Sequence, residues 1–99
     1  MDTQLMKGKY RAFIFLDIVP GKEKEFAKKL MRFDEVVEVH LIVGEYDIFA
    51  VLEFEIYGRA LYSSPQEIIS RFILDKIRKF REVKDTNTII PTYSYTKKP

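Results

Sequence analysis

The segment Val43-Gly44-Glu45-Tyr46-Asp47 is the part of this sequence best suited to binding a small molecule. Its glycine permits a tight turn or the close approach of a ligand to the backbone, and the Asp47 carboxylate can accept hydrogen bonds from free backbone N–H groups. Such a turn can hold a zwitterion, because a carboxylate binds an ammonium group and backbone amides bind a carboxylate. Taken alone, however, the segment favours a plain tight turn.

Residues for catalysis or metal binding are scarce. The 99 residues include one histidine, His40, and no cysteine, which excludes a disulfide scaffold, a thiolate metal cluster and a cysteine nucleophile. Glu38 and Glu53 are not accompanied by a second base or a nucleophile, and a lone histidine on a strand is more often a hydrogen-bonded interface residue. We therefore expect no enzymatic activity, no catalytic residues, no metal and no cofactor.

The charge pattern argues against a nucleic-acid site. The chain has 17 Lys and Arg against 15 Asp and Glu, and residues 34–57 hold seven acidic and no basic residues. The basic residues elsewhere alternate with acidic ones four positions apart, as in Glu25 and Lys29, which is typical of a solvent-exposed helix face. A nucleic-acid binder concentrates positive charge on one element. The sequence thus predicts no direct DNA binding.

The length allows one domain over residues 1–99, with a core at about 11–96. No uninterrupted apolar run approaches the roughly 18–20 residues of a membrane span, and residues 1–9 lack the apolar stretch of a signal peptide. We expect a cytoplasmic protein with no membrane contact. A chain this short buries a small core, so association with further copies would add useful burial.

Hydrophobic periodicity predicts six elements, which are strands at 11–19, 36–43, 47–55 and 83–95 and helices at 22–33 and 65–80. Ser64-Pro65-Gln66-Glu67 has the pattern of a capping box with proline in the first helical turn. Pro91 removes a ladder donor, so the last strand lies at an edge or breaks there. The order βαββαβ is that of an α+β, ferredoxin-like fold, in which both helices cover one face of a four-stranded antiparallel sheet.

Strand alternation separates the two faces of this sheet. The face expected beneath the helices is wholly apolar and comprises Ala12, Ile14, Leu16, Ile18, Val37, Val39, Leu41, Val43, Ile48, Ala50, Leu52 and Phe54. The other face mixes apolar residues with the charges of Asp17, Glu38 and Glu53, which is best explained by a partner surface. We predict that two copies pair through this face into a dimeric α+β barrel, with an interface of Phe13, Phe15, His40, Ile42, Phe49 and Val51. A solvated face is the alternative.

Four stretches of the sequence resemble a known protein family, and the most specific of them is residues 36–48. Residues 36–48 are similar to the V-x-E-x-H-x-V-T-G-x-Y-D-h segment of the ligand-binding (RAM) domain of Lrp/AsnC transcriptional regulators. Val19-Pro20-Gly21 before a helix, the late helix 69–80 and the strand 83–90 also resemble the family, so the similarity covers about residues 11–96. The chain departs from the family's pattern at Val43, where Thr is common, and at Glu82, where Gly is usual.

The resemblance implies a module that binds small effectors, typically amino acids, and assembles as dimers that form rings, often octamers. The family's ligand positions correspond here to Gly44, Tyr46, Asp47, Thr86 and Thr88. The two threonines are equally explained by β-propensity alone. The family's regulators carry a helix-turn-helix domain before the ligand domain, for which about ten residues are too few. The expected protein is a stand-alone ligand domain that acts through a full-length regulator of the same family.

Two other classes of protein with different functions have this same topology. One is a small dimeric α+β-barrel enzyme, such as a monooxygenase or a heme-degrading enzyme, with a pocket between the paired sheets near Glu38, His40 and Glu53. The other is an ACT-type regulatory domain, which would place its ligand near Pro20-Gly21. A ligand located between dimers, inside the dimer or at the first strand-to-helix turn distinguishes the three.

Overall fold

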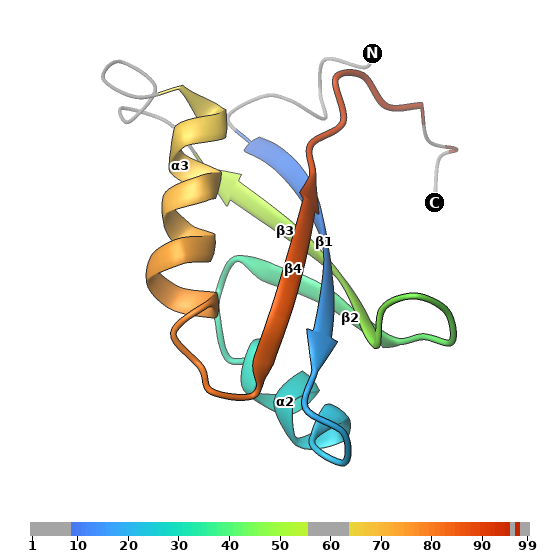
Figure 1. The fold of residues 1–99 in the computed structure, drawn as a ribbon. Coiled ribbons are helices and arrows are strands. Elements are labelled where there is room, and N and C mark those ends of the chain that lie inside the picture. Colours follow the sequence, from blue (N-terminus) through green and yellow to red (C-terminus); the bar gives the residue numbers. More distant parts are fainter. Residues whose placement is uncertain (1–8, 56–63, 96, 98–99) are drawn as a thin grey trace.

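The fold is seen in a computed structural model that describes residues 9–55, 64–95 and 97 (Figure 1). The elements in chain order are β1 (Lys9–Ile18), α2 (Glu23–Leu30), β2 (Val36–Leu41), β3 (Ile48–Glu55), α3 (Pro65–Phe72), the π-helix η2 (Ile73–Ile77) and β4 (Val83–Ile89). The loop expected at 56–63 lies outside the described residues. No helix in the described part of the chain is both long and apolar enough to cross a membrane.

The four strands form one sheet in the order β2-β3-β1-β4, in which every neighbouring pair is antiparallel. With one helix between β1 and β2 and another between β3 and β4, this is the expected ferredoxin-like α+β fold. The central strands are β1 and β3, which pair Ile14 with Ala50 and Phe15 with Phe49. The edge strands are β2 and β4, as Pro91 predicted for the last one.

The helix α3 begins as its sequence predicts. The Ser64 hydroxyl accepts a hydrogen bond from the Glu67 backbone N–H at 3.1 Å, and the Glu67 carboxylate accepts one from the Ser64 N–H at 3.4 Å. Pro65 occupies the first turn, where no N–H donor is needed. These local contacts satisfy the orphan amides of the first turn, so the capping box is confirmed.

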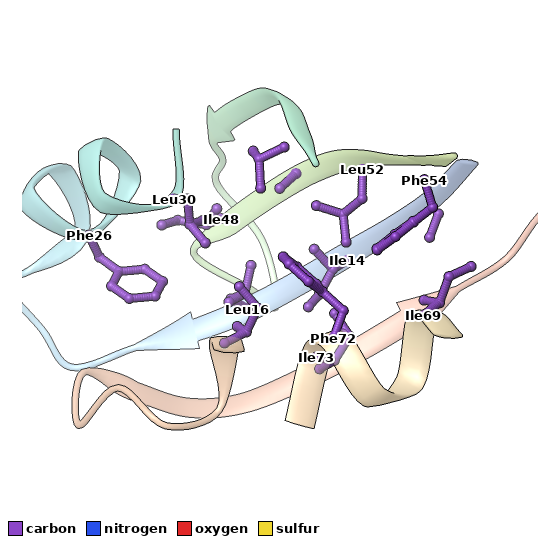
Figure 2. Close-up of a cluster of buried hydrophobic side chains, with 14 of the residues drawn as sticks. Ile14, Leu16, Phe26, Leu30, Ile48, Leu52, Phe54, Ile69, Phe72 and Ile73 are labelled. Carbon is purple, nitrogen blue, oxygen red and sulfur yellow. The ribbon is translucent and has the colours of Figure 1, made fainter. Parts of the chain in front are cut away.

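Both helices pack on the same face of the sheet, where Figure 2 shows their side chains meeting those of β1 and β3. Phe26 and Leu30 of α2 and Ile69 and Phe72 of α3 are buried. Phe72 lies edge-to-face with Phe54 of β3, with the ring centroids 5.2 Å apart. Alternation in β1 and β3 thus predicted this face correctly, because the core residues of these strands are Ala12, Ile14, Leu16, Ile18, Ile48, Ala50, Leu52 and Phe54.

In β2 the predicted core face is only partly confirmed. The pairing with β3 shifts between Val36 and Glu38, and this bulge turns Val36 into the core while Val37 is 39% exposed. Leu41 faces the helix side but is 48% exposed, since β2 is an edge strand, and Val43 lies beyond the strand, fully in solvent. Val39 alone of the four predicted residues packs against the core.

Several elements end earlier than expected. The first helix spans 23–30 rather than 22–33, β2 ends at Leu41, and β4 ends at Ile89 rather than at residue 95. The late helix changes from α to π at Ile73. Pro91 explains the end of β4, because it has no N–H to continue the ladder.

Candidate ligand-binding site

The face of the sheet away from the helices carries a row of aromatic rings. The register places Phe13, Phe15 and Phe49 together, with ring centroids 5.0 Å apart for Phe15–Phe49 and 5.9 Å for Phe13–Phe49. His40 stacks on Phe49 at 5.8 Å and contacts the Glu38 carboxylate through Nε2 at 3.0 Å. The three phenylalanines are half-buried, and both helices lie on the opposite side of the sheet. We call this surface the open face.

The residues predicted for a dimer interface are therefore neighbours on one surface. Val51, opposite Phe13 in the register, is buried, and Ile42 is half-buried at the end of β2. His40 is exposed. Their contact with a second copy stays a prediction, since one chain is described.

A hollow of about 250 Å³ lies at one end of the open face, beside the turn between β2 and β3. This turn projects beyond the sheet as a green loop in Figure 1. The hollow is lined by Phe15, Ile42, Glu45, Tyr46 and Asn87. The Tyr46 ring lies 5.6 Å from that of Phe15, at an interplanar angle of 40°. Aromatic, aliphatic, amide and carboxylate groups thus converge from two strands, β1 and β4, and from the segment between β2 and β3.

Asp47 holds this turn against the end of β1. One oxygen of its carboxylate accepts a hydrogen bond from the Ile18 N–H at 2.8 Å, and its own N–H donates to the Leu16 carbonyl at 2.9 Å. The Asp47 carbonyl accepts from Ile42 at 3.0 Å, which closes the turn. The predicted capping of free N–H groups by this carboxylate is therefore confirmed.

The backbone of the turn is available to a ligand. The N–H groups of residues 43–46 make no hydrogen bond to the backbone of another described residue. Gly44 has a φ of +156°, which L side chains rarely adopt, and a Cβ there would meet nothing within 4 Å. Glycine thus adopts a backbone conformation here that another residue would adopt only with strain.

Thr86 and Thr88 lie on the other side of the sheet from the hollow. They pair with Leu16 and Ile14, whose side chains belong to the core, and the Thr86 hydroxyl accepts a hydrogen bond from Arg78 at 3.2 Å. Within one chain they are not brought together with Tyr46. Asn87, between them, pairs with Phe15 and lines the hollow. Sequence reasoning missed Asn87; alternation along β4 would have found it once the register with β1 was known.

Three aspartates lie near the carboxyl end of β1, outside the lining of the hollow. Asp17 lies directly opposite Asp85 in the β1–β4 pair. Interaction with the Asp47 carboxyl, together with desolvation and the nearby negative charges, raises the pKa of Asp17, while Lys84 opposes the shift. We call Asp17, Asp47 and Asp85 the acidic corner.

The chain is a ferredoxin-like domain with a hollow beside its β2–β3 turn, and the comparisons with known proteins identify its family. The family model of the Lrp/AsnC ligand binding domain matches residues 11–55. The chain is 32% identical to the crystal structure of FFRP-DM1, with a TM-score of 0.67 over 83% of this chain and 97% of that one. The chain belongs to the Lrp/AsnC family, and its fold is that of the family's ligand-binding domain.

Full-length relatives are transcriptional regulators. Over 81 residues the chain is 35% identical to the uncharacterized HTH-type transcriptional regulator PH0140 of Pyrococcus horikoshii, covering 82% of this chain and 46% of the relative. The chain thus spans about half the length of the curated relatives it matches. A regulator of Neisseria meningitidis, NMB0573, solved as a complex with L-Met, shares the fold at 20% identity, with a TM-score of 0.68 over 97% of this chain and 59% of that one. Family membership decides against the ACT-type alternative.

Proposed function

We propose that this domain binds an amino acid in the hollow beside the β2–β3 turn and couples binding to the assembly of copies, thereby regulating transcription. The observation that carries the proposal is the convergence of Phe15, Glu45, Tyr46 and Asn87 around about 250 Å³, beside a turn whose N–H groups make no hydrogen bond to the backbone of another described residue. This volume is smaller than the roughly 300–1,000 Å³ of pockets for drug-sized ligands, which suits a molecule of amino-acid size. The complex of the Neisseria regulator with L-Met supports the ligand class.

Each lining group has a distinct task in this proposal. The Glu45 carboxylate binds the ligand's ammonium group, while the Asn87 amide and the N–H groups of residues 43–46 bind its carboxylate. Phe15 and Tyr46 contact its side chain. Gly44 keeps the amides accessible and Asp47 fixes the turn on β1.

The threonines have a role only if the site is shared. Thr86 and Thr88 lie on the edge strand β4, where a further dimer can approach. A ligand bound between dimers, as the family resemblance implies, would reach them from a neighbouring copy.

Ligand and second copy would contact adjoining surfaces. Phe15 and Ile42 belong both to the hollow and to the proposed dimer interface on the open face. A half-apolar, aromatic surface bordered by charges is typical of a protein interface. Binding is allosteric if the assembly states differ in their affinity for the ligand, and the shared residues provide the physical link.

Isothermal titration against the twenty amino acids tests the proposal, with sedimentation velocity before and after ligand addition. We expect at least one amino acid to bind and Tyr46→Ala to weaken its binding at least tenfold. Tyr93→Ala is the matched control, because this exposed tyrosine lies beyond β4 and does not line the hollow. Absence of binding to all twenty would leave an assembly role only.

The transcriptional role is tested separately. In this proposal the domain is not an enzyme and does not contact DNA; it acts by joining a full-length regulator of the family. The regulators among its relatives support this view. A gel-shift assay of such a regulator should change when this protein is added, and the change should depend on the ligand. DNA binding by the domain alone would contradict it.

A further inference from the structure

We infer that the outer face of α3 and η2 docks into a hollow at the β2–β3 edge of a second copy, so that copies join head to tail away from the open face. The inference goes beyond the proposed function, because it concerns a second contact between copies. It requires no amino acid to bind beside the β2–β3 turn.

Opposite charges gather on two separate parts of the domain. Residues 71–81, which run from the end of α3 through η2, hold five basic residues and one acidic residue, whereas residues 34–55, which include β2 and β3, hold seven acidic residues and no Lys or Arg. The strand β2 forms one edge of the sheet and β4 the other. Arg78, which follows η2, donates a hydrogen bond to the Thr86 hydroxyl of β4 at 3.2 Å. The basic segment therefore lies beside one edge of the sheet and the acidic segment includes the other.

A hollow of about 360 Å³ opens at the acidic edge, and we call it the edge hollow. Its lining consists of Lys9, Asp34, Glu35, Val37, Glu53, Phe54 and Glu55. The bulge in β2 turns Val37 outward, so an aliphatic side chain that is 39% exposed lies among carboxylates.

The carboxylates of the edge hollow are only partly neutralised. Lys9 and Arg11 both pair with Glu53, at 3.7 Å and 2.8 Å. Within residues 9–55 and 64–95, Asp34, Glu35 and Glu55 form no ion pair. The edge hollow thus combines apolar side chains with carboxylates that can accept hydrogen bonds from cations.

The outer face of α3 and η2 has the complementary chemistry. Leu74 is 62% exposed, and Arg71 and Arg78 lie three residues before it and four residues after it, which places them near it on one side of the helix. Both arginines are exposed, and neither forms an ion pair with another described residue. An apolar side chain flanked by two guanidinium groups matches a hollow that joins Val37 to carboxylates.

The occupant is a second copy because this chain supplies both halves of the contact. Leu74 does not line the edge hollow of its own chain, and the two halves belong to different edges of the sheet. A contact between two different surfaces leaves one free half on each copy, so it repeats from copy to copy and closes into a ring or continues as a chain. The predicted open-face interface uses neither Leu74 nor Val37, so both contacts can form at once.

The contact should be weak and sensitive to salt. One helix face and a small hollow bury less than the roughly 1,200 Å² of a standard stable interface. Its charged groups lie at the surface, where about 0.1 M salt screens interactions beyond about 10 Å. The apolar open face should respond much less to salt, which separates the two contacts experimentally.

Sedimentation velocity of the full chain at about 50 mM and about 500 mM NaCl provides the first test. We expect species larger than a dimer at low salt and a return to the dimer at high salt. Leu74→Glu places a carboxylate against the edge hollow and should weaken the larger assembly about tenfold or more, because like charges at an interface repel. The matched control is Met31→Glu, which makes the same change at an apolar position of α2 that is 50% exposed and outside the edge hollow.

A variant of the other half tests the head-to-tail arrangement. Asp34→Arg should also weaken the larger assembly, whereas the control Glu25→Arg, at an exposed position of α2, should not. Mixing Leu74→Glu with Asp34→Arg should restore association, because the first variant keeps an intact edge hollow and the second keeps an intact helix face. Thermal unfolding of each variant at the wild-type temperature checks that the fold is retained.

Four outcomes would overturn the inference. They are a wild-type chain with the same assembly at both salt concentrations, a Leu74→Glu variant that assembles like the wild type, a mixture that does not associate, and loss of the dimer itself in Leu74→Glu. A wild-type chain that shifts DNA in a gel, with the shift abolished by Arg71→Glu, would assign the basic surface to nucleic acid instead. Calorimetric titration with amino acids is independent of all these results, so failure here leaves the ligand-binding proposal standing.

Discussion

The two faces of the sheet are built from alternate residues of the same strands, yet they differ in what covers them. On one face the side chains of β1 and β3 are sealed beneath α2 and α3, and Ala12, Leu16 and Leu52 are wholly buried. On the open face Phe13, Phe15 and Phe49 contact one another but stay half-exposed, with carboxylates at the border. The comparison teaches that this chain covers one apolar surface by itself and leaves a second, aromatic one half-exposed.

The largest effect should come from the covered face. Leu52→Ala removes a wholly buried side chain, and such substitutions cost about 2–5 kcal/mol through lost burial and the cavity left behind. Urea unfolding should show the loss at every protein concentration. Val37→Ala, on the exposed bulge of β2, should change stability by less than about 0.5 kcal/mol. Equal effects would mean that the core assignment is wrong.

On the open face we expect a loss of association rather than of folding. Phe49 contacts the rings of Phe13, Phe15 and His40, so it is the central anchor of the proposed interface. Phe49→Ala should weaken dimerisation by about 2 kcal/mol or more. Sedimentation equilibrium measures this change. If the wild-type chain stayed monomeric at high concentration, the prediction that the open face is a dimer interface would be wrong.

Asp47 joins the turn of the open face to the core. Asp47→Ala leaves the buried Ile18 N–H without its acceptor, which should cost about 1–3 kcal/mol. Asp47→Asn retains an acceptor oxygen and should restore most of this stability in thermal unfolding. If alanine and asparagine were equally destabilising, the hydrogen bond would not be the cause.

The smallest expected effects concern pH, and they have opposite signs for two carboxyls. Hydrogen bonds from the Lys29 ammonium and from its own backbone N–H lower the pKa of Glu82 below its ordinary 4.5. The stabilisation that the ionised Glu82 carboxylate provides is therefore fully present above pH 4.5, and it is lost as the pH falls through the lowered pKa of Glu82. The raised pKa of Asp17, ordinarily 3.8, means that the folded state holds this proton more tightly, so stability from this group increases as the pH falls.

Thermal unfolding between pH 3 and 7 checks both signs. At pH 7, Glu82→Gln should lower the melting temperature and Asp17→Asn should raise it. The pH dependence of each variant should lose the contribution of the replaced group. If Asp17→Asn also lowered the melting temperature, the ionised Asp17 and Asp47 carboxylates would not repel each other in the folded state.

Local patterns predicted much of the fold because their causes are local. The capping box at Ser64 and Glu67 satisfies its own helix, and alternation in β1 and β3 holds because both are central strands without a bulge between residues 12 and 16 or 48 and 54. The tight turn at Gly44 and the capping by Asp47 depend on residue chemistry. These features need no knowledge of distant parts of the chain.

The site depended on information that is not local. Asn87 reaches the hollow, and Thr86 and Thr88 turn away from it, because of the register between β1 and β4, which are far apart in the sequence. A shift of one residue in register exchanges the two faces of a strand. The high β-propensity of threonine therefore predicts a strand but not the face of the sheet on which each threonine lies. The bulge that exposes Val37 is also not predictable from the local sequence, because it arises from the pairing of β2 with β3.

The sequence by itself determined the order of strands and helices, the apolar sides of the central strands and the tight turn between β2 and β3. Their causes are periodicity, capping and turn chemistry, which act within a few residues. Only the tertiary structure decided that Phe15, Tyr46 and Asn87 share one hollow and that Asp17 lies opposite Asp85 in the strand pair. Long-range strand pairing brings these groups together, and its register is set by burial of the whole sheet rather than by any one segment.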